Sequence, residues 1–82
     1  MIRDTIVQAF DAVFREFKEI EPPSVADDAP LMEIGLDSLD YAVLVTRLHD
    51  ELGFDPFTLS TDSFYPTTFG EFVSFYERFA PT

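Results

Sequence analysis

Residues 35–53 read GLDSLDYAVLVTRLHDELG, a stretch that contains the start and stop signals of one helix. Asp37 is a suitable N-cap, because its carboxylate can accept hydrogen bonds from first-turn amides that have no partner within the helix. Gly53 can adopt the left-handed conformation with which many helices end. We therefore predict a helix over Leu39 to Leu52, with Ser38 at the junction between a loop and this helix.

The predicted helix has apolar side chains on two sides. At about 100° of rotation per residue, one group forms a stripe typical of a core face. This group is Tyr41, Leu44, Val45, Leu48 and Leu52, and nearly opposite lie Leu39, Ala42, Val43 and Thr46. Two apolar sides would also suit a helix buried all round, although such a helix is less expected in a chain of 82 residues. We interpret the second group as an exposed docking strip that begins directly after Ser38 and is flanked by the acids Asp40, Asp50 and Glu51.

Two further helices are predicted from the apolar spacing. A stripe with steps of three and four predicts a helix from about Asp4 to Ile20, which Pro22 and Pro23 end. Its members are Ile2, Ile6, Val7, Phe10, Val13, Phe14, Phe17 and Ile20. Thr68 and Glu71 match a capping box, so a last helix should start there. Its apolar face contains Phe69, Phe72, Val73, Tyr76 and Phe79, and Pro81 closes the chain.

The two segments that connect these helices show no regular spacing of apolar residues. Residues 21–36 are punctuated by prolines, aspartates and Gly35, which predicts a long ordered loop, and such loops are often functional. Residues 55–66 leave room for one short helical turn around Leu59 to Phe64. The predicted fold is therefore all-α: a small four-helix bundle of three main helices and a short third helix, formed by residues 1–82 as a single domain.

Composition narrows the possible functions. The net charge is −11, which disfavours nucleic acid and anionic membranes and favours basic protein surfaces as partners. Ten of the sixteen acids lie in residues 21–62, where Arg47 is the only Lys or Arg, so the acidity surrounds Ser38. Because the chain has no cysteine, any thiol chemistry must come from an attached group. We expect a cytoplasmic monomer without membrane insertion, because no apolar run could span a bilayer and no signal peptide is recognisable.

The run Gly35, Leu36, Asp37, Ser38, Leu39, Asp40, at the start of an acidic helix in a chain of this length, resembles the acyl carrier protein family. The resemblance covers the whole chain and includes Gly53 and the threonines Thr67 and Thr68 before the last helix. It implies that Ser38, with Asp37 and Leu39 as motif neighbours, is esterified with 4′-phosphopantetheine from coenzyme A by a phosphopantetheinyl transferase. It also implies a non-catalytic carrier that holds acyl groups as thioesters on the thiol of that arm.

The resemblance leaves the cargo open between fatty acyl, polyketide and aminoacyl groups. Further implied partners are an acyl- or aminoacyl-loading ligase and downstream acyl transferases or synthases with basic docking surfaces. Arg47 and His49 interrupt a helix face that is strongly acidic in many fatty-acid carriers, so a dedicated biosynthetic pathway is favoured. Phe57, Phe64 and Tyr65 are expected in the core or, alternatively, in a groove beside the arm. The dense phenylalanine content predicts at most partial burial of a long acyl chain.

Three other interpretations of Ser38 remain at this stage. An unmodified serine before an apolar period is often a helix cap. Ser38 could also act with His49 and Asp50 as a hydrolase, although eleven helical residues would separate serine and histidine by roughly 16 Å. Finally, the chain could be an acidic helical docking module without carrier chemistry. No metal site is expected, because the acids lack the spacing of a calcium loop.

Overall fold

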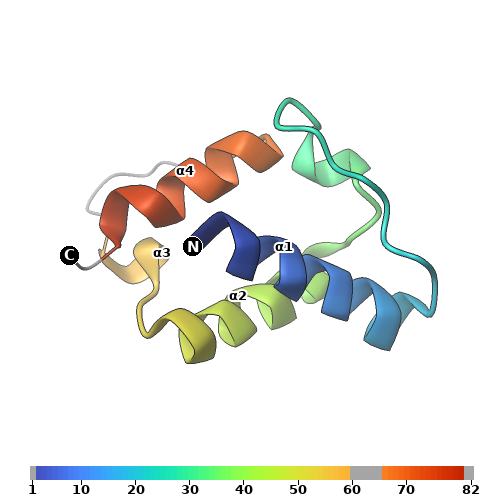
Figure 1. Ribbon diagram of the computed structural model, residues 1–82, viewed down its shortest axis with the longest axis horizontal. Coiled ribbons are helices and arrows are strands. Elements are labelled where there is room, and N and C mark those ends of the chain that lie inside the picture. The colour runs from blue at the N-terminus through green and yellow to red at the C-terminus, as the bar shows by residue number, and fades with distance from the viewer. Residues whose placement is uncertain (1, 60–65, 81–82) are drawn as a thin grey trace.

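The computed structural model describes residues 2–59 and 66–80. Its elements are α1 (Ile2–Val13), the π-helical turn η1 (Phe14–Lys18), the 3₁₀ turn η2 (Leu31–Glu33), α2 (Ser38–Leu52), α3 (Pro56–Leu59) and α4 (Phe69–Phe79). No β-strand occurs in these two ranges. The chain runs out along α1 and back along α2, while α4 lies across the other side of the core (Figure 1). The expected all-α fold of three main helices and a short third one is confirmed.

The first helix changes its geometry before it ends. Residues 14–18 form a π-helical turn, which is wider than an α-helical turn and changes which side chains lie above one another. Phe17 at this turn is 53% exposed, so its membership in the predicted apolar stripe does not correspond to a place in the core. Glu19, with φ of 56°, ends the helix ahead of the two prolines. Ile20 follows that stop and is also exposed, which corrects its placement in the core stripe.

The second helix begins and ends at the predicted signals. Asp37 is its N-cap and shares a capping box with Asp40, and Gly53 ends it with φ of 82°. The helix starts at Ser38, one residue before the predicted first residue. Leu44 and Leu48 of the predicted core stripe are fully buried. Local capping chemistry therefore sets where the loop becomes a helix.

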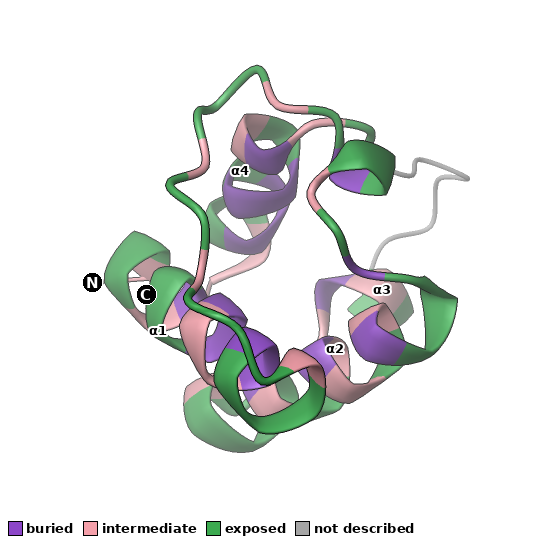
Figure 2. Cartoon of the chain, turned by 90° about the vertical axis from the view of Figure 1, so that its right-hand side faces the viewer, coloured by how far each residue is buried: buried purple, intermediate pink, exposed green. Residues whose placement is uncertain are grey.

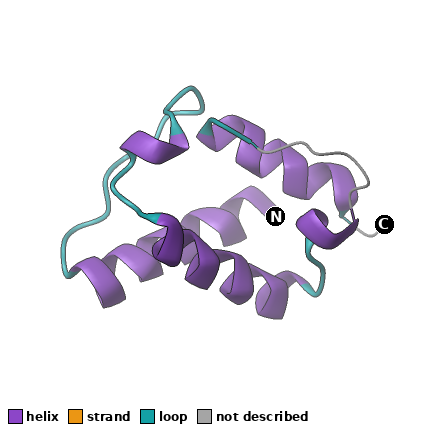
Figure 3. Ribbon diagram, turned by 180° about the vertical axis from the view of Figure 1, so that it is seen from behind, coloured by secondary structure: helices purple, strands orange, loops and turns teal. Residues whose placement is uncertain are grey.

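The loop between these helices is held against the start of α4 by backbone hydrogen bonds. Leu31 N–H donates to the Thr67 carbonyl at 2.9 Å, and Gly70 N–H donates to the Asp27 carbonyl at 2.8 Å. The loop also contains η2, which the sequence did not predict. The Tyr41 hydroxyl donates to the Leu31 carbonyl at 2.6 Å and so ties η2 to α2. Seen from behind, the loop, η2 and the start of α2 lie close to one another (Figure 3).

The last two helices differ in how well they were predicted. α4 begins at the Thr68 and Glu71 capping box, as expected. The short helix lies at Pro56–Leu59, ahead of the predicted turn, and most of that predicted turn falls outside the described residues. The predictions for Phe64, Tyr65 and Pro81 also fall outside them.

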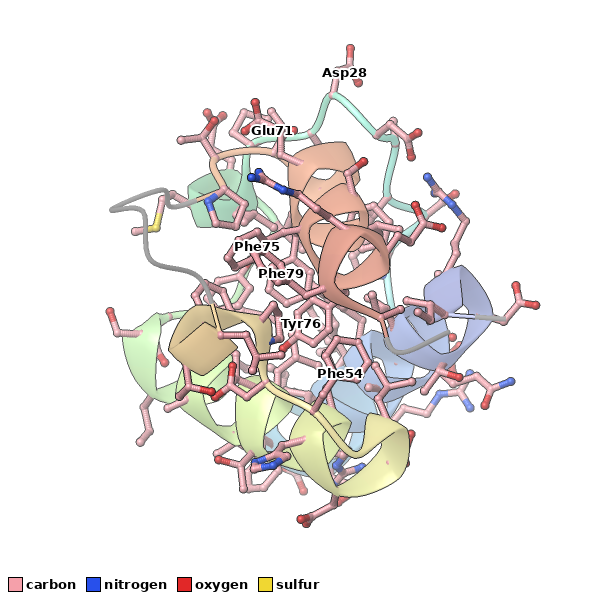
Figure 4. The ribbon with its side chains drawn as sticks, turned by 90° about the vertical axis from the view of Figure 1, so that its left-hand side faces the viewer. Asp28, Phe54, Glu71, Phe75, Tyr76 and Phe79 are labelled. Atoms are coloured by element: carbon pink, nitrogen blue, oxygen red, sulfur yellow. The ribbon has the colours of Figure 1, made fainter. Side chains whose placement is uncertain are left out.

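Aromatic rings occupy the space where the helices meet. Phe10 of α1 makes edge-to-face contacts with Phe69 and Phe72, at centroid distances of 5.2 and 5.9 Å. The rings of Tyr76 and Phe54 lie 6.0 Å apart at the other end of α4, where both side chains face the interior (Figure 4). Buried residues line the inner sides of α1, α2 and α4 (Figure 2). Edge-to-face packing stabilises such a core beyond the burial of area alone.

Candidate attachment site at the start of α2

Ser38 is exposed and is the first residue of α2. It is not the helix cap: the Asp40 N–H donates to Asp37 Oδ1 at 2.9 Å, and the Asp37 N–H donates to Asp40 Oδ2 at 3.0 Å. Among the described residues, the Ser38 hydroxyl makes no hydrogen bond. The interpretation of Ser38 as a capping serine therefore loses its basis, because Asp37 performs that role.

The surroundings of Ser38 suit an attached phosphate. The amides of Ser38 and Leu39 belong to the first turn, where helix geometry provides no acceptor within the helix. The positive end of the helix dipole favours an anion at the same place. The neighbouring Asp37 carboxylate opposes it, but that side chain is 68% exposed and thus well screened by water. These residues fit a phosphodiester on the Ser38 oxygen.

Lys18 of η1 reaches this turn from the first helix. Its Nζ lies 2.7 Å from Asp40 Oδ2 and 4.0 Å from Asp37 Oδ2. The hydrogen bond from Lys18 and the one from the Asp37 amide hold the pKa of Asp40 below its usual value. The same contact raises the pKa of Lys18. Asp40 is only 8% exposed, so the expectation that it flanks the docking strip as an exposed acid is wrong: its carboxylate is a structural group beneath Ser38.

The docking strip, defined by Leu39, Ala42, Val43 and Thr46, is largely at the surface. Leu39 is 73% exposed, and Ala42 and Thr46 are exposed too, whereas Val43 is half-buried against the core. A shallow depression of about 410 Å³ is lined by Ala42, Val43, Thr46, Arg47 and Asp50. Asp50 and Glu51 are exposed beside it. The exposure of the docking strip is compatible with the docking of a partner protein.

Arg47 contributes less positive charge to this surface than its sequence position suggests. It donates two hydrogen bonds to the Glu16 carboxylate, at 2.9 and 3.0 Å, and it is half-buried. The bond to Arg47 lowers the pKa of Glu16. A bidentate pair of this kind neutralises the guanidinium locally. Glu16 of η1 therefore cancels part of the positive charge with which Arg47 interrupts the acidic face of α2.

Sequence reasoning missed an apolar pocket beside Tyr41 and Val45 of α2. Its volume is about 260 Å³, and its lining residues are Leu31, Met32, Tyr41, Val45, Phe57, Pro66, Thr67 and Phe72. Met32 is 79% exposed, so this pocket lies at the surface. The sequence feature nearest to it was Phe57, which was predicted to lie either in the core or in a groove beside the arm. Phe57 lines this pocket and packs on Phe75 with the ring centroids 4.9 Å apart.

The hydrolase interpretation does not suit this geometry. Ser38 and His49 lie on the same helix, eleven residues apart, so roughly 16 Å of helix axis separates them. No cluster of three potential metal ligands occurs in the described part of the chain. Among the same residues, no helix has both the length and the apolar character needed to cross a membrane.

An exposed serine at a capped helix start, on a small acidic helical bundle, is compatible with a protein that carries a group attached to its surface. A comparison with family models agrees: the model described as phosphopantetheine attachment site matches residues 8–67. The chain belongs to this family of phosphopantetheine-dependent carrier proteins, which includes the acyl carrier proteins. Comparisons with curated proteins and with solved structures gave no match.

Family membership establishes the cofactor and the general role. The cofactor is 4′-phosphopantetheine, attached covalently, and the protein is a carrier. Carrier domains of this family are generally non-catalytic, and they interact with phosphopantetheinyl transferases and with synthases or transferases.

Proposed function

We propose that Ser38 is the attachment residue and that the protein itself catalyses no reaction. The observation that carries this proposal is that Asp37 and Ser38 have separate roles at the start of α2. Asp37 supplies the cap, which leaves the exposed Ser38 hydroxyl without a partner among the described residues. When bound, the arm supplies a thiol that holds cargo as a thioester. The residues of the chain hold the serine in place and offer two first-turn amides to its phosphate.

The proposed cargo is an acyl group, with fatty acyl, polyketide and aminoacyl chains all compatible with the surface. The apolar pocket beside Tyr41 supports an acyl chain of some length, because each buried methylene contributes about 0.8 kcal/mol. Since the exposed Met32 forms part of its wall, the pocket favours partial burial of a chain. Thermal unfolding of the acylated protein tests this: stability should rise over the first few methylenes and then level off. A steady rise up to long chains would contradict it.

The proposed partners are a phosphopantetheinyl transferase, a loading ligase and downstream acyl transferases or synthases of a dedicated pathway in the cytoplasm. The docking strip, with the exposed Asp50 and Glu51 beside it, suits an apolar patch with a basic rim. Asp40 no longer belongs to this set, because its carboxylate is occupied by Lys18. The protein would meet these enzymes as a monomer and a single domain.

Incubation with coenzyme A and a phosphopantetheinyl transferase of broad specificity tests the attachment site. Intact mass should show the gain of one phosphopantetheine group in the wild type and none in Ser38→Ala. Ser74→Ala, at an exposed serine on α4, is the matched control and should load normally. Circular dichroism establishes that both variants fold. If the wild type fails to load while a known carrier loads under the same conditions, the alternative of an unmodified acidic docking module is favoured.

A further inference from the structure

Lys18 is the last residue of the π-helical turn and contacts Asp40 of α2. One turn before it in the chain lie Val13 and Phe14, which are both buried, so Lys18 leaves the helix on its inner side. Its side chain is only 30% exposed. The same turn leaves Phe17 exposed and is followed by the left-handed Glu19. Both features cost stability, and π turns are frequent at functional sites, so the contact made by Lys18 calls for a functional explanation.

A single oxygen atom joins Lys18 to the capping box. Asp40 Oδ2 accepts from Lys18 Nζ at 2.7 Å and from the Asp37 amide at 3.0 Å. The two hydrogen bonds between Asp37 and Asp40 close a ring that contains Ser38. The box at α4 is built locally from Thr67, Thr68 and Glu71, whereas the box around Ser38 includes a cation from another helix.

Loss of the lysine would leave the Asp40 carboxylate with one backbone donor in a largely buried position. A carboxylate in that situation turns toward water or takes up a proton, because an uncompensated buried charge is costly. Either change weakens the acceptor of the Asp37 amide and loosens the turn that holds Ser38. A transferase must bring the serine oxygen into line with a phosphorus atom, so a small displacement of this turn slows the transfer.

We propose that Lys18 is a positioning residue for the modification of Ser38, acting through Asp40. This inference rests on the proposed function, namely that Ser38 carries the arm. The contacts of Lys18 are with the carboxylates of Asp40 and Asp37, and it makes none with the serine oxygen. It fixes the capping box and thereby the direction in which the serine is presented to the transferase.

The test compares two ion pairs that link η1 to α2. Lys18→Met removes the pair at Ser38 and keeps the length of the side chain, and Lys18→Arg restores the charge. Glu16→Gln breaks the second pair, with Arg47, nine residues along α2 from Ser38. Lys18 and Arg47 are similarly exposed, at 30% and 28%, whereas their partners differ, at 11% for Asp40 and 54% for Glu16. Lys18→Met should therefore destabilise the protein more, so the Tm of each variant is measured and loading is assayed well below the lower one.

Loading by the transferase should distinguish the two pairs. With coenzyme A saturating, Lys18→Met should lower kcat/KM for the carrier about tenfold, while Lys18→Arg and Glu16→Gln stay near the wild type. Amide hydrogen exchange gives a readout independent of the enzyme: the Asp37 and Asp40 amides should exchange faster in Lys18→Met alone. Lys18→Gln should behave as Lys18→Met does, which provides a second variant if one folds poorly.

The outcomes separate the inference from the proposed function. If the wild type loads and Lys18→Met loads at the same rate, the positioning role is overturned while the attachment at Ser38 stands. Equal losses in Lys18→Met and Glu16→Gln would assign the effect to general stability and would also overturn it. If the wild type does not load at all, the proposed function fails, and the inference fails with it.

Discussion

Two tyrosines, the half-buried Tyr41 and the fully buried Tyr76, should respond in opposite ways to removal of the hydroxyl group. The Tyr41 hydroxyl donates to the Leu31 carbonyl at 2.6 Å, and burial raises the pKa of Tyr41 to about 12. Tyr76 is fully buried, and its hydroxyl has no hydrogen-bond partner among the described residues. Burial also raises the pKa of Tyr76 above its ordinary value. One hydroxyl is thus a satisfied donor, and the other is a desolvated polar group.

The magnitudes follow from these environments. Tyr41→Phe removes the shorter of two hydrogen bonds to the carbonyl of the buried Leu31, which keeps the Ile34 amide at 3.4 Å, so the free energy of unfolding should fall by about 0.5–1.5 kcal/mol. In a chain of this size, each kcal/mol lowers Tm by about 4–8 °C. Tyr76→Phe removes a group that was desolvated without compensation, so stability should stay equal or rise by up to about 1 kcal/mol. Both variants retain the aromatic ring, so the ring packing is preserved.

Urea unfolding followed by far-ultraviolet circular dichroism measures both changes in one experiment. The slope of the free energy against urea should be the same in all three proteins, because the surface exposed on unfolding hardly changes. The reasoning is refuted if Tyr76→Phe destabilises the protein by 1 kcal/mol or more, a result that would require a hydrogen-bond partner for this hydroxyl.

Three further predictions test the local geometry. Glu19→Gly should stabilise the protein by about 0.5–1 kcal/mol, because Glu19 has φ of 56°, whereas Ser24→Gly in the same loop should not stabilise it; thermal unfolding compares the two. Gly70→Ala should cost about 1–3 kcal/mol in urea unfolding, since the new Cβ would lie 3.0 Å from the backbone oxygen of Asp27. The pKa of Asp40 is lowered from 3.8, so its contribution to stability is complete above that value and is lost as pH falls through the lower folded pKa. Asp40→Asn should therefore weaken the protein at pH 7 and flatten the decline of stability below about pH 4 in an acid titration.

Features that depend on residues close together in the chain were predictable. Asp37, Gly53 and the pair Thr68 and Glu71 act within a few residues of their partners, and the structure places helix ends at each of them. The order of the helices and the position of Ser38 at the start of α2 could be predicted for the same reason. The family match over residues 8–67 agrees with the motif around this serine.

Some side chains of α2 were placed correctly on a face of the helix but not at the correct depth. Helical spacing puts Leu39 and Asp40 on the surface alike, yet Leu39 is 73% exposed and Asp40 is 8% exposed. Asp40 is held by its capping box with Asp37 and by Lys18, which lies 22 positions earlier in the chain. Periodicity describes one helix at a time and carries no information about what a neighbouring helix brings to it.

The sequence by itself therefore determined the helical fold, the capped start of α2 and the serine there, because these depend on short-range hydrogen bonds and on apolar spacing. Only the tertiary structure decided the π turn at residues 14–18, the burial of Asp40, the neutralisation of Arg47 by Glu16 and the apolar pocket beside Tyr41. The last three of these join segments far apart in the chain. Their energies depend on distances between helices, which exist only once the helices have packed.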